Sequence, residues 1–228
     1  VMTFAFTGVG AVGRMSILGL ITLVLLVLPV ILAGRQLIAT AETLAAVALL
    51  MVLVDGYVAY TEGLFGDADV PPQIYIAIVC MLTAAICLGY QYLTHLLAPR
   101  YAALLVLQPV IPLLAYPFVT EPTGWALALV GVALMNLGFG LGVSADRPLF
   151  GLVVLPGEGR WAAFLRDATW VLFALAYGAA IAFAATALVG AVGVPQVVRA
   201  AGVLVLAAAV GVAGALQQRR QPIGDLTG

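Results

Sequence analysis

The chain has 228 residues, of which 64% are hydrophobic and only 8% are charged, and its nine basic residues are all arginines. Soluble domains carry roughly 25% charged residues, so this composition excludes an ordinary water-soluble domain. Lipid offers the backbone no hydrogen-bond partners, and apolar runs of about 20 residues must therefore form helices or closed barrels. These runs lack the alternation of barrel strands, and the net charge of −1 predicts no nucleic-acid partner.

We therefore expect an all-α, polytopic transmembrane helix bundle with about seven spans, forming one membrane domain over residues 1–228. The apolar runs place the helices near 15–33, 40–60, 73–97, 101–119, 123–143, 166–190 and 196–216. Prolines mark the boundaries, since Pro71 and Pro72 precede the third run, Pro99 follows it, and Pro122 and Pro195 stand at later starts. The first run is long enough to be a retained span rather than a signal peptide.

The arginines predict which end of each span faces the cytoplasm. Arg14 and Arg199 fall on one side of the threaded helices, and the other seven fall on the opposite side: Arg35, Arg100, Arg147, Arg160, Arg166, Arg219 and Arg220. Cytoplasmic loops carry the excess of basic residues. We thus expect a multi-pass protein of the cell membrane, in contact with the lipid bilayer, with its N-terminus outside and its C-terminus in the cytoplasm.

The sequence lacks the residues that several cofactors require. A retinal Schiff base and a phosphate-binding P-loop both need lysine, which is missing, and His95 alone cannot supply paired axial ligands to a haem. Cys80 and Cys87 share one predicted helix at roughly 10 Å of rise, too far for a disulfide, and are expected to be packing residues. No cofactor is therefore expected.

Asp55 is the sharpest polar feature within an apolar run. It precedes Gly56 and Tyr57 and lies about five residues, or roughly 8 Å, from the outer end of its predicted helix. A carboxylate at this depth needs a donor, water or a cation. One interpretation is a proton or cation site that opens to the outer face. The other is an interfacial carboxylate bonded to a neighbouring tyrosine or helix end.

Three amides fall at similar predicted depths. Gln91 lies about six residues from the inner end of the third predicted helix, and Gln108 and Asn136 lie about seven from those of the fourth and fifth. Tyr177, about eleven residues into the sixth helix, falls just above them. These four residues predict a polar cavity that binds a small substrate, and Asp55, apart from them near the outer end, is a further candidate substrate-binding residue. In the alternative, the amides form interhelical bonds that hold the bundle together.

The fourth predicted helix contains Pro109, Pro112 and Pro117. Each proline removes a backbone donor, so carbonyls near residues 105, 108 and 113 lose their usual partners and the helix must be irregular. Broken helices line many transport sites. The side-chain amide of Gln108 is expected to serve one of the freed carbonyls.

Small residues recur every four positions near the C-terminus. They are Ala174, Gly178, Ala182, Thr186 and Gly190 on the sixth predicted helix, and Ala207, Gly211 and Ala215 on the seventh. Such stripes let helix backbones approach closely, either within the chain or against other membrane subunits.

Asp67 and Asp69, with Glu62 nearby, are the candidate ligands for a metal ion. Carboxylates two apart can hold a divalent cation through oxygen atoms. This arrangement suits a membrane enzyme that acts on a lipid-linked substrate, such as a glycosyltransferase, although acidic residues in a polar loop are usually only solvated.

The runs GRQLIATAETLAAVALLMVLVDGYVAY, QPVIPLLAY and GWALALVGVALMNLG resemble uncharacterised bacterial polytopic integral membrane proteins, in which a cytosolic head precedes many helices. The resemblance implies a helical membrane fold and no particular activity, and the shorter chain is expected to be a fragment or a reduced relative. We expect a permease-like protein or a membrane-embedded accessory or scaffold subunit, with the membrane enzyme as the alternative.

Overall fold

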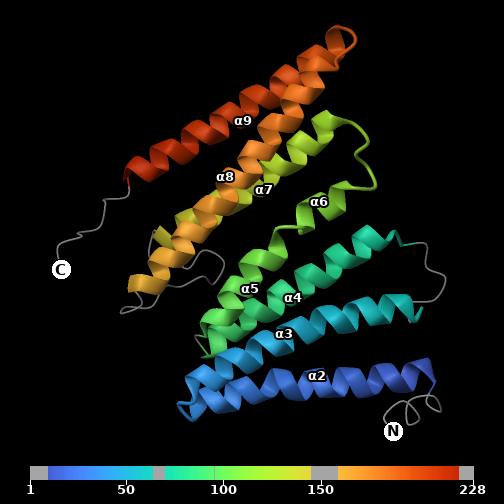
Figure 1. The fold of residues 1–228 in the computed structure, drawn as a ribbon, viewed down its shortest axis with the longest axis vertical. Helices are drawn as coiled ribbons and strands as arrows, with labels where there is room; N and C mark the ends of the chain where they lie inside the picture. The colour runs from blue at the N-terminus through green and yellow to red at the C-terminus, as the bar shows by residue number, and fades with distance from the viewer. Residues whose placement is uncertain (1–9, 64–69, 95, 145–158, 221–228) are drawn as a thin grey trace. The chain divides into compact units, whose positions relative to one another are not determined.

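The computed structural model describes residues 10–63, 70–94, 96–144 and 159–220, and within these ranges it contains helices and no strand (Figure 1). The helices are α2 (Ala11–Gly34), α3 (Ile38–Thr61), α4 (Pro72–Thr94), α5 (Leu97–Leu107), α6 (Val110–Ala115), α7 (Pro122–Ser144), α8 (Gly159–Val189) and α9 (Val194–Arg220). Seven stretches of the described residues are long and apolar enough to cross a membrane, with Leu97–Ala115 counted as one. The predicted all-helical fold with about seven spans is confirmed.

Prolines explain how the third and fourth spans differ from the predicted bounds. The fourth span, predicted as one helix over 101–119, begins at Leu97, is interrupted between Leu107 and Val110, and ends at Ala115. Pro99 does not close the third span; it stands in the first turn of α5, where its missing N–H is not needed. Pro109 lies at the interruption, where a regular helix would require a backbone donor.

The chain divides into two compact units, Val1–Leu113 and Leu114–Gly228, and the boundary falls within α6. Unit 1 contains α2, α3, α4 and α5, and unit 2 contains α7, α8 and α9. The single membrane domain over residues 1–228 stays a prediction.

The core of unit 1 is built around one face of α3. Ala41, Ala45 and Ala48 have no exposed surface, and their small side chains let the neighbouring helices approach closely. The hydroxyl of Tyr90 in α4 donates to the carbonyl of Leu26 in α2. From α4, the free cysteines Cys80 and Cys87 are buried, as expected of packing residues.

In unit 2 the central helix is α7. Half of its apolar window is buried, against 28% for α8 and 22% for α9. Phe173 and Tyr177 of α8 stack with ring centroids 5.7 Å apart. Both face α9, because a methyl group added at Gly211 would meet the Tyr177 hydroxyl and one at Gly214 would meet the Phe173 ring. Glycine therefore allows the close approach of α9 to α8.

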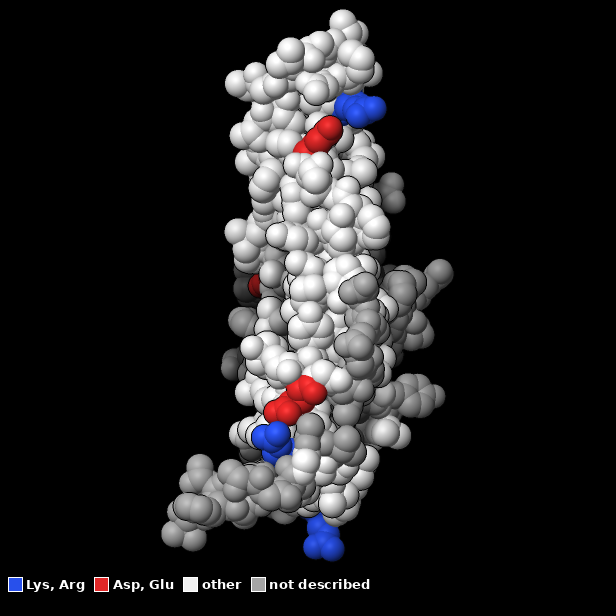
Figure 2. All heavy atoms as spheres, turned by 90° about the vertical axis from the view of Figure 1, so that its right-hand side faces the viewer, with Lys and Arg blue, Asp and Glu red and all other residues white. Residues whose placement is uncertain are grey.

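The remaining helix surface is apolar. Leu20, Leu93, Val171 and Leu175 are each more than half exposed. On the face drawn in Figure 2, charged atoms form small groups separated by uncharged surface. In water, so much exposed apolar surface would favour aggregation, whereas in a bilayer it would contact hydrocarbon.

Candidate functional site

Asp55 lies on the inward face of α3. It is seven residues after Ala48 and four before Ala59, both buried, so all three share one side of the helix. Its Oδ1 atom is buried and has no hydrogen-bond partner among the described residues. A carboxylate oxygen in such surroundings lacks the donor that would offset its loss of hydration.

The residues next to Asp55 pack tightly and use their polar groups elsewhere. A Cβ atom at Gly56 would lie 2.5 Å from a methyl of Val79, so α3 and α4 are in close contact at this level. The hydroxyl of Tyr75 donates to the Gly56 carbonyl at 2.8 Å, and the Tyr75 ring lies 5.1 Å from that of Tyr60. Because the Tyr75 hydroxyl donates to Gly56, Tyr75 does not support the interpretation in which a neighbouring tyrosine bonds to Asp55.

In a second carboxylate of α3, that of Glu42, each of the two oxygens accepts a hydrogen bond. The backbone N–H groups of Leu97 and Ala98 donate to its Oε1 and Oε2, each at 2.6 Å. These are orphan donors in the first turn of α5, whose own N-cap, Leu96, provides no side-chain acceptor. The negative charge also faces the positive end of the α5 dipole. Glu42 therefore attaches the start of α5 to α3.

Neither Glu42 nor a structural role for Arg100 was predicted above. The signal for Glu42 is an acidic residue inside an apolar run with no basic residue one helical turn away, which calls for a partner from another helix. Arg100 entered the prediction only through the charge bias of the loops, yet it is buried, with 2% of its surface exposed. Arg100 is the fourth residue of α5, so it lies close to the start of that helix, where Glu42 binds the N–H groups of Leu97 and Ala98.

Gln108 repairs the interruption of the fourth span. Pro109 has no N–H for the Leu105 carbonyl, and the backbone N–H of Gln108 donates to that carbonyl instead, at 3.2 Å. This leaves the Leu104 carbonyl, which accepts from Nε2 of the Gln108 side chain at 2.8 Å. Gln108 thus donates to two carbonyls beside the interruption. Its side-chain amide was expected to serve a carbonyl freed by a proline, and it binds the neighbouring carbonyl of Leu104, whereas the backbone N–H of Gln108 serves Leu105.

The observed bounds change the depths of the predicted amides. Gln91 lies three residues before Thr94 at the end of α4, and its side chain is outside the description. Gln108 lies eleven residues after Leu97 at the start of α5. Asn136 lies eight residues before Ser144 at the end of α7. The equal depths inferred from the sequence do not hold with these bounds, and a substrate-binding role for the three amides stays a prediction.

Asn136 and Tyr177 both belong to unit 2. Asn136 is 1% exposed, and its Nδ2 donates to the Val132 carbonyl one turn earlier at 3.1 Å. Tyr177 is directed at Gly211 of α9. Gln108 belongs to unit 1, so the structure does not place it with these two residues.

The predicted metal ligands Asp67 and Asp69 lie outside the described residues. Among the residues that are described, no three acidic, histidine or cysteine side chains group closely enough to hold a metal ion. Glu62, the third member of the predicted set, is paired with Arg14 at 3.3 Å.

The small-residue stripes have different surroundings. On α9, Ala207 is buried and Gly211 contacts Tyr177, so this stripe makes an internal contact with α8. On α8, the whole predicted stripe is exposed: Ala174, Gly178, Ala182, Thr186 and Gly190. Internal packing uses another face of α8, which carries Thr169, Phe173 and Ala180.

No protein-family model, curated protein or solved structure matches the chain. Its class follows from the structure itself: within the described residues, seven apolar helical stretches of spanning length and many exposed apolar side chains indicate a multi-pass integral membrane protein.

Proposed function

We propose that the chain is a permease-like protein of the cell membrane in which Asp55 binds a proton or a small cation. The observation that carries the proposal is the buried Oδ1 atom of Asp55, which has no donor among the described residues. An ionisable residue inside a span is expensive and commonly marks an ion or proton pathway. A bound proton or cation removes that cost directly.

The position of Asp55 indicates the side from which the ligand enters. Asp55 lies six residues before Thr61, the last residue of α3, which corresponds to about 9 Å of helix. The arginine distribution assigns this end of α3 to the outside, with the C-terminus in the cytoplasm. The ligand therefore reaches Asp55 from the outer face.

The broken fourth span provides the second part of the proposal. Discontinuous helices commonly line the substrate sites of transporters, because backbone groups freed from the helix can face a cavity. The α5–α6 interruption belongs to unit 1, as Asp55 does, and Glu42 fixes the start of α5 to α3. Unit 1 is thus the proposed transport unit.

Carbodiimide labelling tests the binding step without knowledge of the substrate. A hydrophobic carbodiimide reacts with carboxylic acids that hold a proton in apolar surroundings. We expect mass spectrometry of the labelled full chain in bilayer vesicles to find the adduct on Asp55 and not on Glu42, whose two oxygens accept strong hydrogen bonds. Protection by sodium ions identifies a cation as the ligand, and labelling that sodium does not slow identifies a proton. Unlabelled Asp55 in the absence of added cations would overturn the proposal.

Ion flux tests the transport step. Vesicles containing the full chain should show a proton or sodium flux, and Asp55→Asn should abolish it while Asp55→Glu retains part. Glu62→Gln is the matched control, because it removes a carboxylate at the end of the same helix that is already paired with Arg14. Equal flux through the native chain and Asp55→Asn would contradict a role for Asp55.

The exposed stripe of α8 supports a second role, as a subunit that contacts another membrane protein. Ala174, Gly178 and Ala182 leave a smooth exposed face on which a helix can pack closely. Gly178→Leu should release a partner that copurifies with the native chain, whereas Leu175→Ala, on a neighbouring exposed position, should not. Identical copurification with both variants would exclude this contact.

A further inference from the structure

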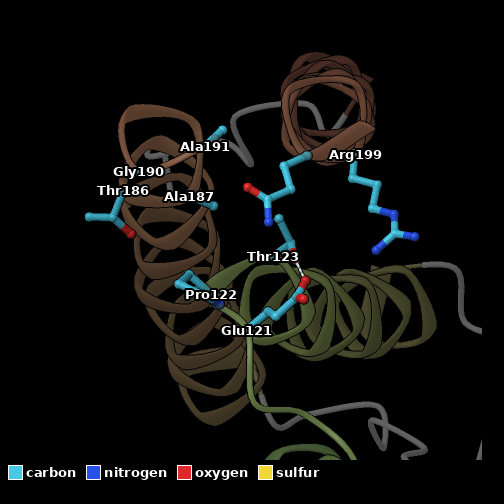
Figure 3. A pocket seen from close by; sticks show the side chains of 9 residues that line it. Glu121, Pro122, Thr123, Thr186, Ala187, Gly190, Ala191 and Arg199 are labelled. Atoms are coloured by element: carbon cyan, nitrogen blue, oxygen red, sulfur yellow. Dashed lines mark hydrogen bonds between the residues drawn. The ribbon is translucent and has the colours of Figure 1, made fainter. Parts of the chain in front are cut away.

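Unit 2 contains a pocket of about 160 Å³ at the end where α7 begins, α8 ends and α9 begins (Figure 3). This cavity is open to the surface, and both of its charged residues, Glu121 and Arg199, are exposed. A water molecule occupies roughly 30 Å³ of the liquid, so the space admits a small polar group of several heavy atoms. Its polar lining comes from Glu121, Thr123, Thr186, Gln196 and Arg199. None of these residues was predicted to form a site.

Local structure keeps the cavity open. The wall contributed by the end of α8 and the residues just after it includes Ala187, Gly190 and Ala191, which leave space because their side chains are small or absent. The turn that follows has Gly193 at φ +105°, a conformation that glycine adopts readily. The Gln196 side chain accepts from the Val192 N–H at 2.8 Å and fixes the turn to the first residues of α9.

The cavity holds two opposite charges that do not neutralise each other. The guanidinium of Arg199 extends from α9 toward the side of the cavity where the carboxylate of Glu121 lies (Figure 3). Arg199 makes no hydrogen bond or ion pair with a described residue. Among the described residues, the carboxylate of Glu121 accepts one long hydrogen bond, of 3.4 Å, from Thr123 Oγ1. Five guanidinium donors and most of a carboxylate are therefore available to a ligand.

From this arrangement we infer that the cavity binds a zwitterionic group composed of a phosphate and a primary ammonium. Arg199 binds the phosphate, for which its planar fork of donors is suited, and the positive end of the α9 dipole adds to the attraction. Glu121 and the Thr123 hydroxyl accept hydrogen bonds from the ammonium. The ligand has no net charge, as the Glu121 and Arg199 pair has none.

The lining distinguishes a primary ammonium from a quaternary one. Quaternary ammonium groups have no N–H to donate and are typically bound by aromatic rings. The nine residues that line the cavity include no aromatic side chain, whereas Glu121 and Thr123 offer oxygen acceptors. Phosphoethanolamine therefore fits the site, and phosphocholine does not.

The position of the cavity at the ends of the spans indicates a lipid headgroup as the source of this group. The lining residues lie at the ends of three candidate spans, Pro122–Gly140, Asp167–Val189 and Val194–Leu216. Ends of spans meet the headgroup layer of a bilayer. The same zwitterion also occurs on small soluble molecules, and the experiment separates the two sources.

Native mass spectrometry of the full chain in detergent tests the site with phosphatidylethanolamine, phosphatidylcholine of the same acyl chains, and soluble glycerophosphoethanolamine, which carries the same uncharged phosphodiester zwitterion. We expect the native chain to prefer the ethanolamine lipid by about tenfold or more, and Arg199→Gln or Glu121→Gln to weaken its binding about ten- to hundredfold. Arg199→Lys keeps the charge and should lose less. Ala187→Leu fills the cavity without removing a charge and should also block binding.

The matched control is Arg14→Gln with Glu62→Gln, which removes an arginine and a glutamate that already pair with each other at the ends of other spans. It should leave the lipid preference unchanged. Lipid binding that soluble glycerophosphoethanolamine does not displace supports the headgroup, and displacement supports the same site for a soluble zwitterion. Equal binding of both lipids to the native chain, or binding unchanged in Arg199→Gln and Ala187→Leu, would overturn the inference.

Discussion

The two ends of α3 each carry a carboxylate, and the two have opposite surroundings. Glu42 accepts two short hydrogen bonds from the start of α5, whereas the buried Oδ1 of Asp55 accepts none from a described residue. Residue type and placement in an apolar run are therefore insufficient to identify a functional carboxylate. The partners decide: Glu42 is explained by the attachment of one helix to another, and Asp55 is not explained by the fold.

The largest effect is expected from Glu42→Gln. The glutamine oxygen can still accept one N–H, but its NH₂ group would face the second N–H and leave a helix donor unsatisfied. Hydrogen bonds to charged groups contribute roughly 1.5–3 kcal/mol, so we expect a loss of about 3 kcal/mol in the free energy of unfolding. Denaturant unfolding in mixed micelles measures this loss.

The control for Glu42 is Glu62→Gln at the other end of α3. Glu62 is partly exposed and pairs only with Arg14, and such surface pairs contribute about 0–1 kcal/mol. An unfolding midpoint for Glu42→Gln that matches that of Glu62→Gln would show that the contact with α5 is not structural, and the contrast with Asp55 would disappear.

The second largest effect is expected at Gly56, the neighbour of Asp55. Gly56→Ala would place a methyl group 2.5 Å from a methyl of Val79, and Val79 has little rotamer freedom within a helix. Overpacking of this kind costs about 1–3 kcal/mol. Gly89→Ala is the matched control in α4, because nothing lies within 4 Å of its added atom. It should be neutral or stabilising, and equal unfolding free energies for the two variants would contradict the close contact beside Asp55.

The third variant tests Gln108, whose side-chain amide has a backbone hydrogen-bond partner, as the Glu42 carboxylate does. Gln108→Ala removes the donor to the Leu104 carbonyl, and we expect a loss of about 1–2 kcal/mol. Pro109→Ala supplies a backbone N–H at the interruption and should reduce this cost in the double variant. Additive losses in a double-mutant cycle would show that Gln108 does not compensate for the proline.

The spans were predictable from the sequence because each depends on one local property, a long apolar run bounded by proline or charge. The irregularity at Pro109 was predictable because proline has no backbone N–H to donate. A hydrogen bond from the Gln108 side chain to a nearby carbonyl was predictable because that side chain carries the amide donors. The Glu42 contact with Leu97 and Ala98 was not, because it joins two helices through backbone groups that every residue carries. The cavity at Glu121 and Arg199 was missed because it requires small residues from one helix to face charges from two others.

The smallest effect on stability is expected from Asp55→Asn. Its Oδ1 loses no hydrogen bond among the described residues, and a neutral amide is less costly to bury than a carboxylate without a partner. The free energy of unfolding should therefore stay within about 0.5 kcal/mol of the native value or rise, which is the range of substitutions that remove no contact. In the double variant with Glu42→Gln the two changes should add, because the sites share no partner. A loss comparable to that of Glu42→Gln would mean that Asp55 has a structural partner, as Glu42 does. A small change together with lost ion flux would assign Asp55 to function alone.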